Sequence, residues 1–155
     1  MELNTITNLE YDILIVDDSD DTLELLSALL TIVGYKVSTA NNGVKALLSI
    51  KEKQFSLILL DIMLPDIDGY EVCRKLKADE SSKNIPIIFI SALNDEPAKT
   101  KGFSLGAADF IIKPFYKDEV LARVKTQLDL SLKKEQLLND INILKTIEES
   151  LSTIS

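Results

Sequence analysis

Short apolar segments alternate with longer amphipathic segments along most of this sequence. The apolar segments have the length and the aliphatic, β-branched character of strands buried on both faces of a sheet. They occupy residues 11–16, 36–40, 56–60, 85–90 and 109–113. Between and after them, apolar residues spaced three and four apart predict helices at 21–33, 44–53, directly after Asp68, at 94–106 and from 116 onward. In the helix 44–53 we expect Val44, Leu47 and Leu48 to face the core.

Strand and helix alternate five times, which is typical of a parallel sheet with helices on both faces. We therefore expect an α/β fold with a flavodoxin-like, doubly wound, five-stranded parallel sheet in the order 2-1-3-4-5, followed by an extended C-terminal helix. In that order, the strands that lead into Asp17, Asp61, Ser91 and Lys113 are neighbours. Their polar ends should converge on one crevice at the carboxyl edge of the sheet.

An acidic cluster, DDSDD, follows the first strand. Ser19 or Asp20 could cap the next helix, which accounts for one or two of its acids. It does not account for adjacent Asp17 and Asp18 at the same sheet edge as Asp61. Three carboxylates would repel each other there unless a cation neutralised them, and a few oxygen ligands suit Mg²⁺.

The residue types at this edge suit phosphoryl transfer. Asp61 would be the nucleophile, as carboxylates are in aspartyl-phosphate enzymes. Lys113 and Mg²⁺ would neutralise charge on the phosphoryl group, and Ser91 would donate a hydrogen bond to it.

Two stretches, LLDIMLPDIDGYEV and GAADFIIKPF, closely resemble the receiver domain of bacterial two-component response regulators. The resemblance covers roughly residues 11–128. It implies that Asp61 is the phosphoacceptor and that the Lys113–Pro114 bond is cis. It also implies the following residue roles: Mg²⁺ ligands Asp17, Asp18, Asp61 and the main-chain carbonyl of Met63; switch residues Ser91 and Phe110; and the site lysine Lys113.

The resemblance implies a phosphorelay response regulator. A histidine kinase or a histidine phosphotransfer protein would donate the phosphoryl group, since the chain has no histidine of its own. Phosphorylation would draw Ser91 toward the phosphate, turn Phe110 inward and change the surface around the helices 94–106 and from 116. Such a protein is not an enzyme beyond its own phosphorylation and dephosphorylation. The alternative is a receiver-like dimerisation scaffold that is never phosphorylated.

Two other functions fit the residues poorly. A phosphatase with an Asp nucleophile needs a second Asp two residues on, where this chain has Met63. A flavin or nucleotide binder needs a phosphate-cradling loop after the first strand, where this chain has DDSDD.

Composition narrows the expected partners. The net charge of −8 disfavours nucleic acid, so we expect no direct nucleic-acid partner. No apolar run is long enough to span a membrane. The single Cys73, expected in the core, fits a reducing cytosol and hence a cytoplasmic location.

The chain divides into three predicted parts: a flexible leader at 1–10, the receiver domain at 11–128, and a helical coiled-coil extension or linker at 129–155. In the last part Leu130, Leu137, Leu144 and Leu151 recur every seven residues, as in a coiled coil. We expect a parallel homodimer through this helix, weakened by Lys134 and Glu148 at alternate seam positions. The alternative is a lone amphipathic helix that folds back on the domain.

Overall fold

The computed structural model describes residues 11–154, so the predicted leader at 1–10 lies outside the described residues. Its centre is a five-stranded, all-parallel sheet in the order β2-β1-β3-β4-β5, which confirms the predicted fold. The strands are β1 (Asp12–Val16), β2 (Lys36–Ala40), β3 (Leu57–Leu60), β4 (Ile87–Ser91) and β5 (Asp109–Ile112).

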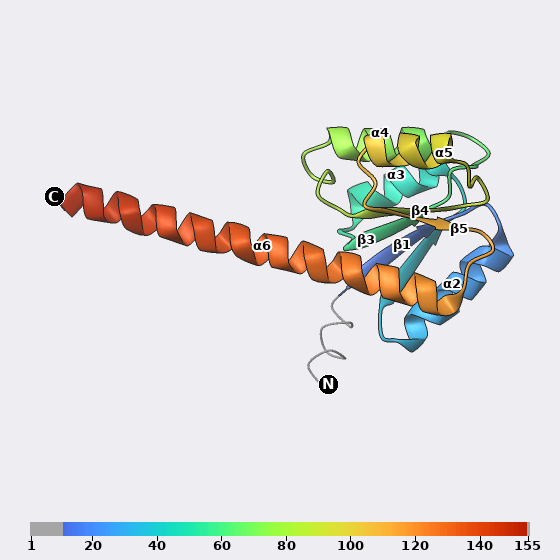
Figure 1. Cartoon of the computed structure of the whole chain (residues 1–155), viewed down its shortest axis with the longest axis horizontal. Coiled ribbons are helices and arrows are strands. Elements are labelled where there is room, and N and C mark those ends of the chain that lie inside the picture. The colour runs from blue at the N-terminus through green and yellow to red at the C-terminus, as the bar shows by residue number, and fades with distance from the viewer. Residues whose placement is uncertain (1–10, 155) are drawn as a thin grey trace.

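Helices cover both faces of the sheet (Figure 1). They are α2 (Asp20–Ile32), α3 (Gly43–Glu52), α4 (Gly69–Ala78), α5 (Glu96–Ser104) and α6 (Lys117–Ile154). Side chains from α2 and α6 pack into one apolar cluster, and side chains from α3 and α4 pack into the other. The sheet therefore separates two cores, as in other doubly wound folds.

The central strand β3 shows why its sequence is a continuous apolar run. All four of its residues are fully buried. Leu57 and Leu59 point into the α2/α6 cluster, whereas Ile58 and Leu60 point into the α3/α4 cluster. Because successive side chains in a strand point to opposite faces, a strand covered on both faces needs apolar residues at every position.

The inner face of α3 differs from our prediction. Val44 and Leu48 are 50% and 54% exposed, although both were expected in the core. The buried face instead contains Gly43 and Ala46, with Leu47 and Ile50 packed against the same cluster. The helix is set in this rotation because Gly43 lies against the loop after β3: a Cβ at this position would lie 2.4 Å from Ile67 Cγ1.

Helix α6 is a single 38-residue helix that begins on the sheet and continues well past it (Figure 1). Val120, Val124 and Leu128 are buried against the α2 side of the core. Every residue at 132–154 is exposed. The alternative in which this helix folds back on the domain is therefore excluded. None of the helices within residues 11–154 has the length and apolar character needed to cross a membrane.

Candidate functional site

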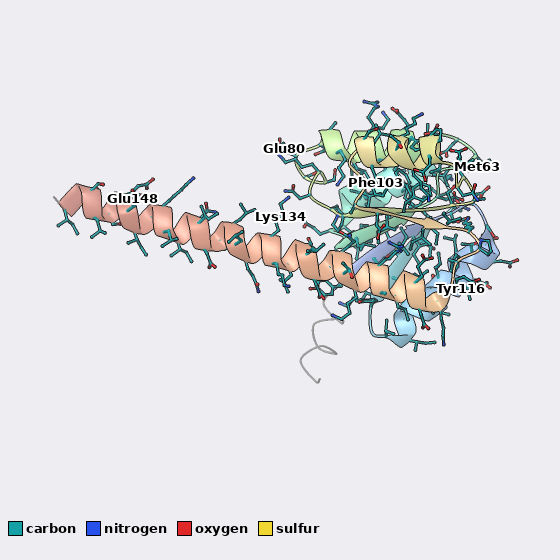
Figure 2. The ribbon with its side chains drawn as sticks, viewed as in Figure 1. Met63, Glu80, Phe103, Tyr116, Lys134 and Glu148 are labelled. Atoms are coloured by element: carbon teal, nitrogen blue, oxygen red, sulfur yellow. The ribbon has the colours of Figure 1, made fainter. Side chains whose placement is uncertain are left out.

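The carboxyl edge of the sheet brings together the polar strand ends that the sequence singled out. Asp17 follows β1, Asp61 follows β3, Ser91 ends β4, and Lys113 follows β5. The backbone extends the strand pairing to these positions: Asp61 N–H donates to Val16 O at 2.9 Å, and Lys113 N–H donates to Ser91 O at 2.9 Å. The exposed side chains of Met63 and Tyr116 mark the same end of the domain (Figure 2).

Lys113 joins the two buried carboxylates. Its Nζ donates to Asp17 Oδ2 at 2.6 Å and to Asp61 Oδ2 at 3.1 Å. Asp17 is fully buried and Asp61 is 4% exposed. Asp17 is held by a second contact, because its Oδ1 accepts from Ser19 N–H at 2.9 Å. One ammonium group therefore contacts two carboxylates that have almost no access to water, and it offsets only one of their two negative charges.

The pKa values of Asp61 and Lys113 are both raised in this group. Burial raises the pKa of Asp61 above its ordinary value, and repulsion by Asp17 raises it further, although Lys113 opposes both effects. Burial alone would lower the pKa of Lys113, but its contacts with Asp17 and Asp61 raise that pKa above its ordinary value. The ammonium thus stays charged, and the Asp61 carboxylate is costly to ionise when Lys113 is the only cation.

Asp18 completes the acidic group. One carboxylate oxygen from each of Asp17, Asp18 and Asp61 lies within 4.8 Å of the others. Asp18 is exposed, so the group is open to solvent on that side. Three carboxylates beside one lysine leave an excess negative charge, and their hard oxygen donors fit a divalent cation such as Mg²⁺. The expected contribution of the Met63 carbonyl stays a prediction.

The loop that carries Asp61 is tied down at two points. Gly69, at the start of α4, lies against the acceptor backbone: a Cβ at this position would lie 2.2 Å from the Asp61 carbonyl oxygen. Asp66 connects the loop to the start of α3, since its carboxylate accepts from Gly43 N–H at 2.9 Å and Val44 N–H at 2.8 Å. These bonds lower the pKa of Asp66 below its ordinary value, against the opposing effect of burial.

Asp66 lies in a stretch, PDIDG, whose composition by itself indicates only a turn. Its contacts with α3 cross 22 and 23 residues of chain. No local pattern in the sequence signals a partner at that distance, so this function of Asp66 was missed.

The expected switch residues lie on β4 and β5. Ser91 is fully buried, and its Oγ accepts a hydrogen bond from Leu93 N–H at 3.3 Å. Phe110 is only 7% exposed, and its ring centroid lies 6.1 Å from that of Phe89. The Phe110 ring therefore already lies in the inward position that we expected after phosphorylation. The Lys113–Pro114 bond is cis, as expected.

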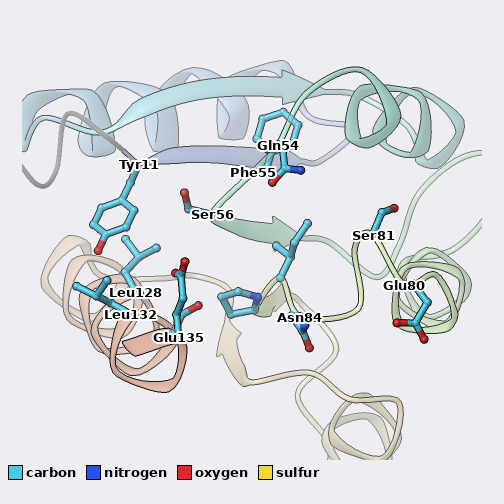
Figure 3. Close-up of a pocket in the computed structure, with 13 residues that line it drawn as sticks. Tyr11, Gln54, Phe55, Ser56, Glu80, Ser81, Asn84, Leu128, Leu132 and Glu135 are labelled. Carbon is cyan, nitrogen blue, oxygen red and sulfur yellow. The ribbon is translucent and has the colours of Figure 1, made fainter. Parts of the chain in front are cut away.

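A separate hollow of about 300 Å³ lies at the opposite edge of the sheet (Figure 3). Tyr11, Ser56 and Pro86, which line it, precede β1, β3 and β4. The other side of the hollow comes from α6, through Leu128 and Glu135 among others. No lysine or arginine lines this hollow within the described residues, so it has no cation for a phosphoryl group.

A doubly wound parallel sheet with an acidic group and a lysine at its carboxyl edge defines a receiver-like protein. The family model for the response regulator receiver domain matches residues 13–125. The chain belongs to this family, which confirms the resemblance found in the sequence.

Individual relatives agree with the family assignment. The chain is 39% identical over 140 residues to a probable transcriptional regulator, ycf27, of Cyanidium caldarium, covering 88% of this chain and 55% of that protein. It is 41% identical over 116 residues to the DNA-binding dual master transcriptional regulator RpaA of Synechocystis, covering 75% of this chain and 48% of that protein. A crystal structure of a putative response regulator from Chloroflexus aurantiacus matches with a TM-score of 0.74 and 38% identity, covering 77% of this chain and 98% of that one.

These relatives correct one prediction about partners. We expected no nucleic-acid partner, but the Synechocystis relative is named a DNA-binding regulator. The chain spans about half the length of the two curated relatives. The net charge of −8 describes only these 155 residues, so it carries no information about contacts made by the rest of a longer regulator.

Proposed function

We propose that this protein is a phosphorelay response regulator that accepts a phosphoryl group on Asp61 from a histidine kinase or a histidine phosphotransfer protein. One observation carries the proposal. Asp61 is the buried carboxylate at the end of the central strand, 3.1 Å from the Lys113 ammonium and within 4.8 Å of oxygens of Asp17 and Asp18. Asp61 follows β3, which lies in the sheet between β1, the strand before Asp17 and Asp18, and β5, the strand before Lys113.

In the proposed reaction an Asp61 carboxylate oxygen forms a bond to phosphorus, and the bond between phosphorus and the donor's imidazole nitrogen breaks. The imidazole leaves with the bonding electron pair, and Asp61 becomes an acyl phosphate. Asp17, Asp18 and Asp61 would hold Mg²⁺, which would supply charge neutralisation at the phosphoryl oxygens. Lys113, which follows β5, then provides a fixed positive charge beside the phosphoryl group.

The buried state of the site prepares Asp61 for this role. The Asp61 carboxylate is costly to ionise when Lys113 is the only cation beside it. A further cation, or a group that spreads its charge, would stabilise it. Lys113 already contacts both Asp17 and Asp61. A phosphoryl group on Asp61 would therefore change how strongly Lys113 is attracted to each of these two side chains. We propose that this shift, together with Ser91, transmits the phosphorylated state to the surface of α5, β5 and α6.

The location of the protein and its output belong to the same proposal. The cytoplasmic location expected from the sequence stays a prediction. Control of transcription is the output suggested by the names of two relatives, and it would require parts of a longer regulator. As an acceptor, the chain would catalyse only its own phosphorylation and dephosphorylation.

Incubation with Mg²⁺ and acetyl phosphate tests the acceptor directly. Intact mass spectrometry should show the addition of one phosphoryl group, and Asp61→Asn should abolish it. Asp68→Asn is the matched control, because it removes a carboxylate from the same loop while Asn remains a good N-cap for α4. Equal labelling of the Asp61 variant would refute the assignment. Absence of labelling in the unaltered protein would favour the dimerisation scaffold.

A further inference from the structure

The part of α6 that extends past the domain is an amphipathic helix with no covering surface in a single chain. Residues 132–154 are all exposed, and they extend about 35 Å at about 1.5 Å per residue. Leu137, Ile141 and Leu144 are 62%, 41% and 64% exposed, and Leu151 is 62% exposed. A continuous row of exposed aliphatic side chains of this length marks an interaction surface.

This row faces away from the receiver domain. At about 100° per residue, the mean direction of Leu137, Leu144 and Leu151 lies about 160° around the helix from that of Val120, Val124 and Leu128, which pack on the sheet. A partner helix can therefore lie along these leucines away from the domain that carries them, and it comes close to that domain only at Lys134, which lines a hollow together with Asn84.

The charges within the row are self-complementary. Lys134 lies seven residues before Ile141, and Glu148 lies seven residues after it. Figure 2 shows both residues on the exposed part of α6. A two-fold axis perpendicular to the helix and close to Ile141 brings Lys134 of one chain within about one helical turn of the partner's Glu148, and the symmetry repeats the pair. This arrangement requires the two helices to run in opposite directions.

The parallel arrangement expected from the leucine repeat alone fits these charges poorly. It stacks Lys134 on the partner's Lys134 and Glu148 on the partner's Glu148 within the seam, where like charges are unfavourable. Asp140 could meet the partner's Lys145 in a parallel dimer, but a pair at the solvent-exposed rim contributes little. The seam charges therefore decide the orientation.

We propose that residues 130–154 pair with the same residues of a second copy in an antiparallel two-stranded coiled coil. The two receiver domains then lie at opposite ends of about 35 Å of paired helix. Each aliphatic row covers the other, and Lys134 and Glu148 neutralise each other at both ends of the seam. The proposal replaces the parallel dimer and does not depend on phosphorylation of Asp61.

Charge reversal in the full 155-residue chain tests both the pairing and its direction. Sedimentation velocity should show a concentration-dependent dimer for the unaltered protein. Lys134→Glu should raise its dissociation constant by about tenfold, because both symmetry-related pairs become repulsive. The double variant Lys134→Glu/Glu148→Lys should restore the dimer. Lys134→Glu/Glu149→Lys is the matched control, since it has the same composition but places the new lysine outside the row, and it should not restore the dimer.

The outcomes separate the alternatives. A parallel dimer keeps a like-charge pair at both positions in every one of these variants, so equal dissociation constants throughout would overturn the antiparallel direction. A monomer at several hundred micromolar would overturn the pairing itself. Small-angle scattering of the dimer should give two separated domains, and a single compact pair of domains would contradict the proposal. Acetyl-phosphate labelling of the same variants should be unchanged, so this test and that of the proposed function fail independently.

Discussion

Replacement of Asp61 by Asn should stabilise the protein in the absence of divalent metal, although it removes the proposed acceptor. The reason is that Asp61 is buried close to Asp17 and shares the single ammonium of Lys113. Asn is nearly isosteric, but its single oxygen can accept from only one of the two donors, Met63 N–H and Lys113 Nζ, which contact different Asp61 oxygens at 3.2 Å and 3.1 Å. The variant therefore removes a charge and keeps the shape of the site, but it loses one of the two accepted hydrogen bonds.

The size of the effect follows from the distances. At an effective dielectric constant of about 20, repulsion between Asp61 and Asp17 oxygens, which lie within 4.8 Å of each other, is at least about 3.5 kcal/mol, and attraction to Lys113 at 3.1 Å is about 5 kcal/mol. These two interactions largely cancel. The remaining cost is desolvation of a carboxylate that is 4% exposed, which amounts to several kcal/mol per buried ion. We expect Asp61→Asn to raise the free energy of unfolding by about 2 kcal/mol.

Urea denaturation followed by circular dichroism, with EDTA at pH 7, measures this difference. The same measurement with Mg²⁺ should reduce or reverse it, because a ligand at 100 times its dissociation constant stabilises the protein that binds it by about 2.7 kcal/mol. The unaltered protein should gain this stabilisation, whereas the variant, with one carboxylate fewer, should gain much less.

The pH dependence supplies an independent check. The pKa of Asp61 is raised in the folded state, so its cost is fully present above that folded pKa. As the pH falls through the folded pKa toward the ordinary Asp value of about 3.9, the folded protein takes up the proton first and the cost disappears. The advantage of Asp61→Asn should therefore shrink on acidification. A variant that is less stable than the unaltered protein in EDTA at pH 7, or an advantage that grows on acidification, would refute this reasoning.

Three further predictions concern the acidic group and its loop. Asp18→Ala should keep the fold but weaken Mg²⁺ binding by about tenfold or more in calorimetric titration; unchanged affinity would remove Asp18 from the proposed ligands. Gly69→Ala should lower the free energy of unfolding by about 2–3 kcal/mol in urea, because the added Cβ would lie 2.2 Å from the Asp61 carbonyl oxygen. Asp66→Ala should weaken Mg²⁺ binding more than Asn42→Ala does, although both remove a cap from α3, because only Asp66 also holds the acceptor loop; equal effects in the same titration would contradict this.

Much of the fold followed from local patterns in the sequence. The alternation of apolar runs with amphipathic segments predicted every strand and helix of the described chain and the order of the strands. It did so because side-chain periodicity and the right-handed crossover rule act on neighbouring segments. The same strand ends placed Asp17, Asp61, Ser91 and Lys113 at one edge. Cys73 is fully buried in the core, as its position on an apolar helix face indicated.

The failures arose where two distant segments set each other's position. The rotation of α3 depends on Gly43 against Ile67, so the helix exposes Val44 and Leu48 although its own sequence allowed them to face inward.

The sequence by itself determined which residues could form the site, because a residue's type and its place at the end of a strand are local properties. Only the tertiary structure decided how those residues share charge. Lys113 lies 96 residues from Asp17 and 52 from Asp61; its contacts with both raise the pKa of Lys113, while burial and the nearby Asp17 raise the pKa of Asp61 against the effect of Lys113. Such shifts depend on distances of a few ångströms and on exclusion of water, and neither is defined until the sheet brings these distant segments together.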